Sequence, residues 1–131
     1  MIKKIFIFDD DQKDLEELEK QMKSVGCEVK TFRTHDSKEI FKQQDVLKFN
    51  PDLAIVDSLF KSELDGMGIV KGLTRTFPGI SIVICTKFVN DATKRVWIKE
   101  QYKDVKGVCA VIGKKPLPTG QEILDLCKKT E

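Results

Sequence analysis

Acidic side chains follow two of the apolar runs in this sequence of 131 residues. The aspartates Asp9–Asp11 come directly after the first run, and Asp57 ends another. Carboxylates that are brought together repel one another and tend to keep their protons unless a cation lies among them. Oxygen ligands of this kind suit Mg²⁺, which keeps several waters and takes one or two carboxylates from a protein. Thr86 and Lys115 follow two later runs and can add a hydroxyl and an ammonium group, and the whole set indicates a phosphoryl-transfer site.

The apolar runs are the elements that must position these side chains. Four of the five runs are nearly continuous and rich in isoleucine and valine, as expected of strands that are buried on both faces. The second run alternates apolar and polar residues, which is typical of an edge strand with one wetter face. The predicted strands are Ile5–Phe8, Cys27–Phe32, Leu53–Val56, Ile80–Cys85 and Val108–Ile112.

Between these runs, apolar residues recur at helical spacing. We expect Asp11 to cap the first helix, and Thr119 with Glu122 forms a capping box ahead of the last one. The strand–helix order, repeated five times, predicts a single α/β domain over residues 1–131, with a five-stranded parallel sheet and helices on both faces. The expected helices carry Leu15, Leu18, Met22 and Val25; Ile40, Phe41 and Leu47, after a capping box of Asp36 and Glu39; Ile69, Val70, Leu73 and Phe77; Val96, Trp97 and Tyr102, from about Asn90; and Ile123 and Cys127.

Ligands of an open parallel sheet bind at the carboxyl ends of its strands, where the polar side chains described above are expected to meet. At these positions the sequence resembles the response-regulator receiver domains of two-component signalling. The resemblance covers nearly the whole chain and implies a flavodoxin-like receiver fold with strand order 2-1-3-4-5. It is carried by four segments in the right order and spacing, Ile5–Asp11, Pro51–Asp57, Ile82–Thr86 and Lys115-Pro116.

The resemblance implies a role for each residue that matches the receiver pattern. Asp57 would be the phosphoacceptor, and Lys115 would pair with it and then with the phosphoryl group. Thr86 would turn its hydroxyl toward a phosphoryl oxygen and draw the loop that follows it inward. The implied Mg²⁺ ligands are the carboxylates of Asp57 and Asp10, with Asp9 helping directly or through water, and the backbone carbonyl of Leu59.

The same resemblance implies a signalling module rather than an enzyme with an external substrate. A partner histidine kinase or phosphotransfer protein would supply the phosphoryl group, and the domain would catalyse only its own phosphorylation and dephosphorylation. The readout would be a population shift at the fourth helix, the fifth strand and the fifth helix. This surface would bind a downstream effector protein, or a second copy of the chain in a homodimer.

Three departures from the receiver pattern motivate an alternative, in which the fold acts as a phosphorylation-independent interaction module. The loop Ser58–Leu64 is one residue longer than usual and contains no proline. Lys87 follows the switch threonine, where receivers usually have a small residue, and Ile112 replaces a residue that is commonly aromatic.

A less favoured alternative is a small phosphohydrolase of the haloacid-dehalogenase type. Asp9 and Asp11 form an Asp-x-Asp pattern after the first strand, as in those enzymes. However, Lys13 stands where that family has threonine or valine, and the second acidic pair late in the chain is missing.

Composition argues against several other classes of protein. The formal net charge of +2 is too small for the concentrated basic surface that nucleic-acid binding requires. None of the four cysteines is in a Cys-x-x-Cys arrangement and His35 is the only histidine, so a zinc site is unsupported. No run approaches the roughly 20 apolar residues of a membrane span, and the first run is too short for a signal peptide. The expected setting is the reducing cytoplasm, with no membrane and no direct contact to nucleic acid.

Overall fold

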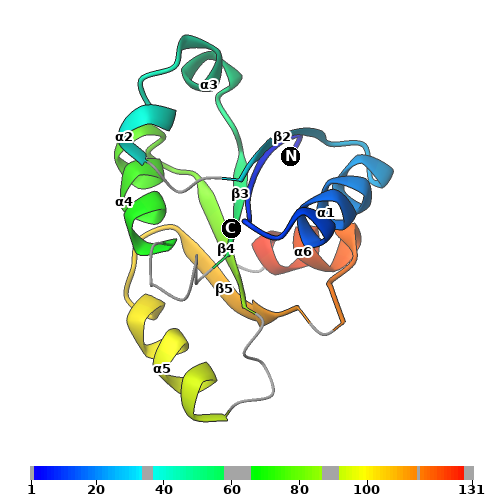
Figure 1. The fold of residues 1–131 in the computed structure, drawn as a ribbon, viewed down its shortest axis with the longest axis vertical. Coiled ribbons are helices and arrows are strands. Elements are labelled where there is room, and N and C mark those ends of the chain that lie inside the picture. Colours follow the sequence, from blue (N-terminus) through cyan, green and yellow to red (C-terminus); the bar gives the residue numbers. More distant parts are fainter. Residues whose placement is uncertain (1, 34–36, 58–65, 87–91, 115, 129–131) are drawn as a thin grey trace.

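The computed structural model of the chain describes residues 2–33, 37–57, 66–86, 92–114 and 116–128 (Figure 1). Strands and helices alternate along the chain, as the apolar runs predicted. The strands are β1 (Lys4–Phe8), β2 (Glu28–Phe32), β3 (Leu53–Asp57), β4 (Ser81–Thr86) and β5 (Val108–Gly113). The helices are α1 (Gln12–Ser24), α2 (Ser37–Ile40), α3 (Gln44–Phe49), α4 (Gly66–Thr76), α5 (Ala92–Tyr102) and α6 (Gly120–Lys128).

The five strands form one parallel sheet in the order β2-β1-β3-β4-β5, which confirms the predicted topology. β1, β3 and β4 are almost entirely buried, whereas β2 at one edge is half-exposed, as its alternating pattern indicated. The pairing of β4 with β5 contains one irregularity, at Ile82 and Val83. Strand order therefore reverses between β1 and β3, which places a crevice at their carboxyl ends.

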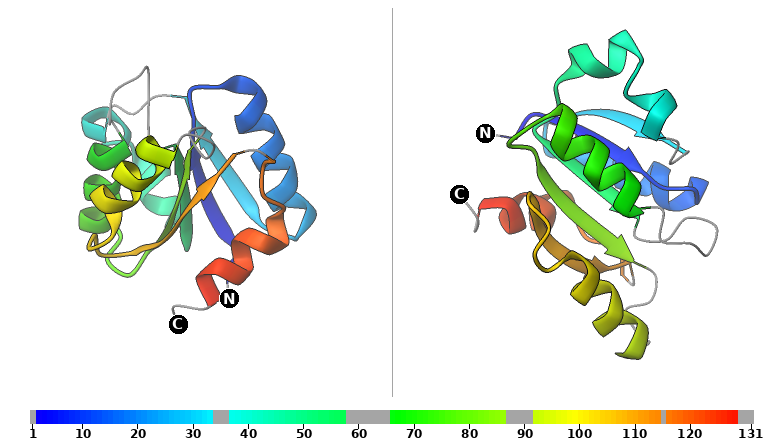
Figure 2. Two further views of the ribbon diagram at one scale, coloured as in Figure 1. Left: turned by 90° about the horizontal axis from the view of Figure 1, so that it is seen from below. Right: turned by 90° about the vertical axis from the view of Figure 1, so that its left-hand side faces the viewer.

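Helices cover both faces of the sheet (Figure 2). The helices α1 and α6 lie on one face, and α2, α4 and α5 lie on the other. Within β1, Ile5 and Ile7 join the core on the α1 and α6 side, whereas Phe6 and Phe8 join the core on the opposite side. Because successive side chains of a strand point to opposite faces, one continuous apolar run contributes to both cores.

The predicted caps of the first and last helices are confirmed. The Asp11 carboxylate accepts hydrogen bonds from the backbone N–H groups of Lys13 and Asp14, at 3.0 and 3.2 Å. The Glu122 N–H donates to Thr119 Oγ1 at 3.1 Å, and the Thr119 N–H donates to Glu122 Oε1 at 3.4 Å. These bonds satisfy backbone donors that have no partner within the helix. The Asp36 of the other predicted box lies outside the described residues.

The segment between β2 and β3 differs from the single helix that was predicted. It forms α2 and α3, which are separated by a turn at residues 41–43. Val46 is fully buried, whereas Leu47, which was expected on the apolar face, is 36% exposed. Since the chain starts a new helix at Gln44, the helical phase is reset and the neighbouring residue faces the core.

The helix α5 also differs in part from its prediction. Tyr102 packs in the core as expected, and Ile98, one turn earlier, is fully buried. Val96 and Trp97 were expected to pack as well, but they are 62% and 48% exposed. Ile98 and Tyr102 are four residues apart and define the buried face, so Val96 and Trp97 project from the other side of the helix.

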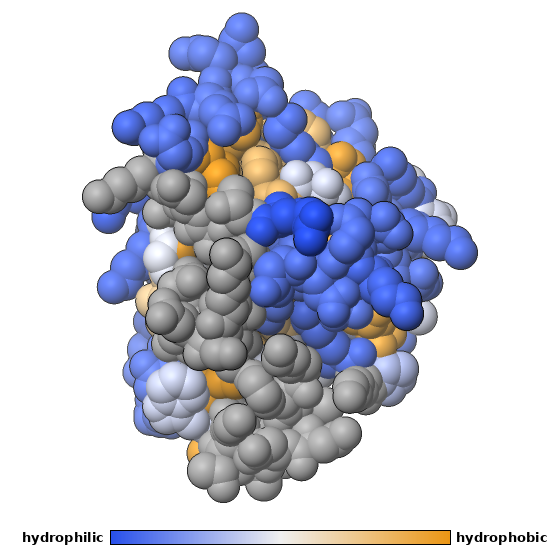
Figure 3. All heavy atoms as spheres, in the orientation of Figure 1, coloured by the Kyte–Doolittle hydropathy of each residue, from blue (hydrophilic) through white to orange (hydrophobic). Residues whose placement is uncertain are grey.

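The surface seen in the orientation of Figure 1 is largely hydrophilic over α1 and α3, with apolar residues visible only in small patches (Figure 3). Among the described residues, no helix has the length and apolar character that crossing a membrane requires.

Candidate functional site

The carboxyl ends of β1, β3 and β4 bring three predicted site residues together. Asp9 directly follows β1, and the register pairs Phe8 with Val56, so Asp9 lies beside Asp57 at the end of β3. Thr86 ends the next strand, β4. All three side chains are buried, with 1% to 5% of each residue exposed. Burial of polar residues at this one edge of the sheet is costly unless they are paired, which marks the edge as a functional site.

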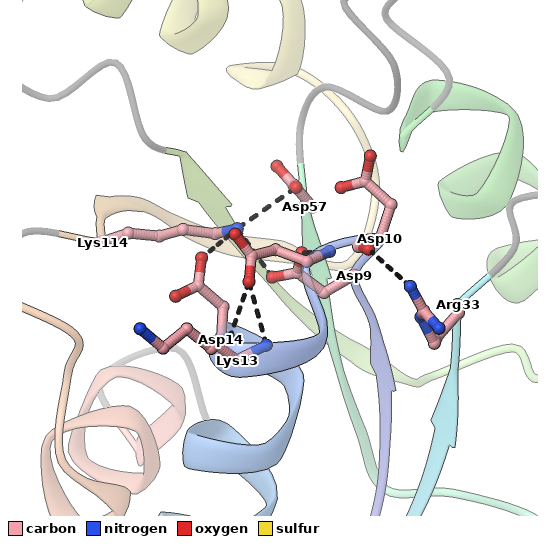
Figure 4. A network of polar contacts seen from close by, with 8 residues as sticks. Asp9, Asp10, Lys13, Asp14, Arg33, Asp57 and Lys114 are labelled. Atoms are coloured by element: carbon pink, nitrogen blue, oxygen red, sulfur yellow. Dashed lines mark hydrogen bonds and ion pairs between the residues drawn. The ribbon is translucent and has the colours of Figure 1, made fainter.

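Among the described residues, Lys114 brings an ammonium group into this site. Its Nζ lies 2.6 Å from Asp9 Oδ2 and 3.2 Å from Asp57 Oδ2, and only 4% of the Lys114 side chain is exposed (Figure 4). The Lys114 N–H donates to the Thr86 carbonyl at 2.9 Å, which fixes the backbone just beyond β5. The predicted lysine, Lys115, lies outside the described residues.

Asp10 completes an acidic group that can hold a cation. One carboxylate oxygen from each of Asp9, Asp10 and Asp57 can be chosen so that all three lie within 4.8 Å of one another. The Asp10 carboxylate points away from the Lys114 ammonium group (Figure 4). Three clustered carboxylate oxygens fit a hard divalent ion such as Mg²⁺. Leu59, whose carbonyl was the fourth predicted ligand, lies outside the described residues.

Burial and neighbouring charges both shift the pKa values of the site. Burial raises the pKa of Asp9, and the hydrogen bond and charge of Lys114 oppose that effect without cancelling it. Burial alone would lower the pKa of Lys114, but the charges of Asp57, Asp9 and Asp14 outweigh it and raise that pKa above its ordinary value. Burial therefore makes Asp9 bind its proton more tightly, and the neighbouring carboxylates do the same for Lys114. A divalent cation would neutralise part of the carboxylate charge.

Two further residues at the site were not predicted. Asp14, in the first turn of α1, places Oδ2 3.2 Å from Lys114 Nζ. Arg33, just after β2, places Nη2 3.5 Å from the Asp10 carbonyl oxygen. The sequence signal for Asp14 was its position three residues after the Asp11 cap, because the first turn of the helix lies at the carboxyl edge of the sheet, as Asp9 does. The sequence offers no comparable signal for Arg33.

The residues that depart from the receiver pattern divide into described and undescribed ones. Ile112 is half-buried and packs against the core beneath α1 and α6. Lys87 and the loop Ser58–Leu64 lie outside the described residues.

On the opposite face, the buried hydroxyl of Tyr102 has no hydrogen-bond partner among the described residues. Burial, with a smaller contribution from the charge of Asp57, raises the pKa of this phenol.

In sequence, the chain matches no protein-family model and no curated protein. In structure, it matches receiver domains along nearly its whole length. A response-regulator receiver domain protein of Clostridium thermocellum is 20% identical with a TM-score of 0.69, covering 98% of this chain and 93% of that one. A CheY-like receiver domain protein of Methanospirillum hungatei is 21% identical with a TM-score of 0.67, covering 99% and 94%.

A third neighbour is the BeF3-activated receiver domain of DrrB, which is 20% identical with a TM-score of 0.67 and covers 98% of this chain and 97% of that one. The chain therefore has the flavodoxin-like fold of response-regulator receiver domains. Similarity at this level of identity defines the fold, and the chemistry rests on the residues described above.

Proposed function

We propose that the chain is a phosphoacceptor receiver domain of a two-component system and that Asp57 is the residue phosphorylated. The observation that carries the proposal is the convergence of Asp57 with Asp9, Asp10 and Lys114 at the carboxyl edge of a receiver-type sheet. Nucleophile, cation ligands and a fixed positive charge are the parts that phosphoryl transfer requires.

In the proposed reaction, a carboxylate oxygen of Asp57 attacks phosphorus carried on a histidine of a partner kinase or phosphotransfer protein. An O–P bond forms, the N–P bond breaks, and the leaving imidazole nitrogen takes a proton from water. When bound, Mg²⁺ would neutralise charge on the phosphoryl oxygens. Asp10 and Asp57 would hold it, Asp9 would help directly or through water, and the carbonyl of Leu59 is the fourth proposed ligand.

Lys114 and Thr86 would hold the transferred group. Lys114 Nζ, 3.2 Å from Asp57 Oδ2, is placed to pair with the carboxylate first and with the phosphoryl oxygens afterwards. We therefore assign this role to Lys114, with its neighbour Lys115 as the alternative that the resemblance implies. The Thr86 hydroxyl would donate to a phosphoryl oxygen and draw the following loop toward the site.

The proposed readout is a change at the surface formed by α5, β5 and α6. Val96 and Trp97 expose large apolar side chains on α5, and β5 is a half-exposed edge strand. Such a surface suits a protein partner, either a downstream effector or a second copy of the chain. The proposed module acts in the cytoplasm by protein contact, without touching nucleic acid, and turns over no external substrate.

The test is incubation with acetyl phosphate and Mg²⁺, followed by intact-mass and peptide mass spectrometry. The expected result is addition of one phosphoryl group at Asp57, lost in Asp57→Asn and retained in Asp52→Asn. Asp52 is a matched control because it lies at the opposite end of β3, where its carboxylate accepts hydrogen bonds from the Lys3 and Lys4 N–H groups. A phosphoryl group on another residue, with Asp57 unmodified, would contradict the assignment.

The alternative is a receiver fold that acts by constitutive association without phosphorylation. The half-buried Ile112, in place of an aromatic residue, is the described feature that favours it. The two functions are separated by beryllium fluoride, which mimics a phosphoryl group on aspartate. If neither acetyl phosphate nor beryllium fluoride with Mg²⁺ modified the wild-type chain, the association module would replace the phosphoacceptor.

A further inference from the structure

Lys114 has a third carboxylate partner, which comes from a helix rather than from a strand end. Asp14 Oδ2 lies 3.2 Å from Lys114 Nζ, the same distance as Asp57 Oδ2. Asp14 and Asp57 approach the ammonium group from opposite sides (Figure 4). Asp14 is absent from the group of carboxylates close enough to share a cation among the described residues. It therefore contacts the lysine without being a candidate metal ligand.

The position of Asp14 is fixed by the start of α1. The Asp11 carboxylate accepts hydrogen bonds from the Lys13 and Asp14 N–H groups, and the Leu15 N–H donates to the Asp11 carbonyl at 2.9 Å. Leu15, the next residue, is buried in the core. The Asp14 side chain is only 28% exposed, and it is held between this capped turn and the lysine. The start of α1 therefore fixes the contact between Asp14 and Lys114.

The charges of the site give this contact a consequence. Among the described residues, the Lys114 ammonium contacts Asp9, Asp14 and Asp57, and Asp10 lies close to Asp9 and Asp57. A phosphoryl group on Asp57 would therefore add negative charge beside several carboxylates. Asp14 would compete with that group for Lys114 and would also repel it. Asp14 has the opposite effect on a bound divalent cation. Its negative charge attracts the cation and offsets the repulsion between the cation and the Lys114 ammonium group.

We propose that Asp14 is a positioning residue that holds Lys114 on the α1 side of the site and so limits how strongly the lysine can pair with a phosphoryl group on Asp57. This inference rests on the proposed function. The inference predicts opposite changes in two binding affinities. Removing the charge of Asp14 strengthens binding of the phosphoryl mimic and weakens binding of Mg²⁺, whereas loss of local structure would weaken both.

The experiment compares the wild type with Asp14→Asn, Asp14→Glu and the control Glu16→Gln. Glu16 is an exposed residue of α1 whose Oε1 accepts from Gln12 Nε2 at 2.7 Å, a bond that glutamine can keep. Calorimetry would give the Mg²⁺ affinity alone and the beryllium fluoride affinity in saturating Mg²⁺. For Asp14→Asn we expect beryllium fluoride to bind about three- to tenfold more tightly and Mg²⁺ about two- to fivefold more weakly, as partly screened charges allow.

Asp14→Glu, which keeps the charge, and Glu16→Gln should both stay within about twofold of the wild type, since neither removes charge from the site. An Asp14→Asn protein that matches the wild type in both affinities, or that loses both, would overturn the inference. If the wild type bound no beryllium fluoride, the proposed phosphoacceptor function would fail, and the Asp14–Lys114 contact would be judged by stability alone.

Stability provides a second test of the Asp14–Lys114 contact. It is measured by urea unfolding without metal, for the wild type, Asp14→Asn, Lys114→Met and the double variant. We expect Asp14→Asn to lower the unfolding midpoint in the wild type and to raise it in the Lys114→Met background, where only carboxylate repulsion remains. Equal shifts in the two backgrounds would show that Asp14 does not hold Lys114.

Discussion

Lys114 Nζ lies 3.2 Å from Oδ2 of Asp57, and both side chains are almost completely excluded from solvent, with 4% and 6% exposed. The pair joins the ends of two strands that are not neighbours, because β4 lies between β3 and β5 in the sheet. The lysine therefore crosses the end of β4, next to Thr86, to reach Asp57, the proposed phosphoacceptor. A phosphoryl group on Asp57 would therefore arrive close to a positive charge that is already present at the site.

The first prediction separates the two adjacent lysines. Lys114→Met should lower the affinity for beryllium fluoride in Mg²⁺ by about 10- to 100-fold, since a charge-assisted hydrogen bond in a buried site is worth about 1.5–3 kcal/mol. Lys115→Met should change it by less than about threefold, as for a screened charge. Titration calorimetry on the two variants gives the comparison directly. A larger loss in Lys115→Met than in Lys114→Met would return the role to Lys115.

The second prediction concerns the pH dependence of stability without metal. The pKa of Asp9 is raised in the folded state above its ordinary value of 3.8, chiefly by burial. A raised folded pKa gives stability that is fully present below the unfolded pKa and is lost as pH rises through the folded pKa. As the pH rises from the ordinary pKa of 3.8 toward the raised folded pKa, the free energy of unfolding of the wild type should therefore fall relative to that of Asp9→Asn, by up to about 1.4 kcal/mol per pH unit.

Urea unfolding at several pH values in the presence of a chelator would measure this difference. Adding Mg²⁺ at neutral pH should stabilise the wild type more than Asp9→Asn, because a ligand that binds only the folded state adds stability with its affinity. Parallel curves of unfolding free energy against pH for the two proteins would show that the pKa of Asp9 is not raised in the folded state.

The positions of Asp9, Asp57 and Thr86 could be predicted because each follows from a strong local pattern. A nearly continuous apolar run marks a buried strand, and the residue at its end must lie at the carboxyl edge of a parallel sheet. The two covered faces follow from the alternation of strands and helices, whereas the strand order was implied by the resemblance to receiver domains. The structure bears out these parts of the prediction at nearly every strand.

The sequence could not show that Lys114 lies in the site, because Lys114 and Lys115 are neighbours at a strand end, and the prediction for Lys115 lies outside the described residues. In an extended chain a shift of one residue turns a side chain to the opposite face. The pairing of β4 with β5 contains an irregularity at Ile82 and Val83, which no pattern in the sequence marks. Asp14 was missed for a different reason, since its contact with Lys114 depends on how α1 packs and not on any strand.

The third prediction concerns the contact between α1 and α6. Gly120 begins α6, and a Cβ atom there would collide with the backbone carbonyl of Gln21 and lie 3.0 Å from Val25 Cγ2. Gly120→Ala should lower the free energy of unfolding by about 1–3 kcal/mol, as overpacking against backbone does. The matched control is Gly68→Ala in α4, where a Cβ atom meets nothing within 4 Å. This control substitution should instead raise the free energy of unfolding by about 0.5–1 kcal/mol.

Chemical unfolding of both glycine variants would test the pair together. The opposite signs matter, because both substitutions replace glycine by alanine within a helix. If Gly120→Ala stabilised the protein as Gly68→Ala does, the helices α1 and α6 would not be in the close contact that the structure describes.

The fourth prediction concerns the buried hydroxyl of Tyr102. Tyr102, the last residue of α5, is 1% exposed in the core, and its hydroxyl has no hydrogen-bond partner among the described residues. Burying an unpaired hydroxyl costs free energy, so Tyr102→Phe should raise the free energy of unfolding by about 1 kcal/mol. Tyr102→Leu is the contrasting variant, because it also removes ring volume and should destabilise by about 1–3 kcal/mol through the cavity it leaves. Urea unfolding of both variants decides the matter, since a loss of stability in Tyr102→Phe would mean that the hydroxyl is hydrogen-bonded in solution.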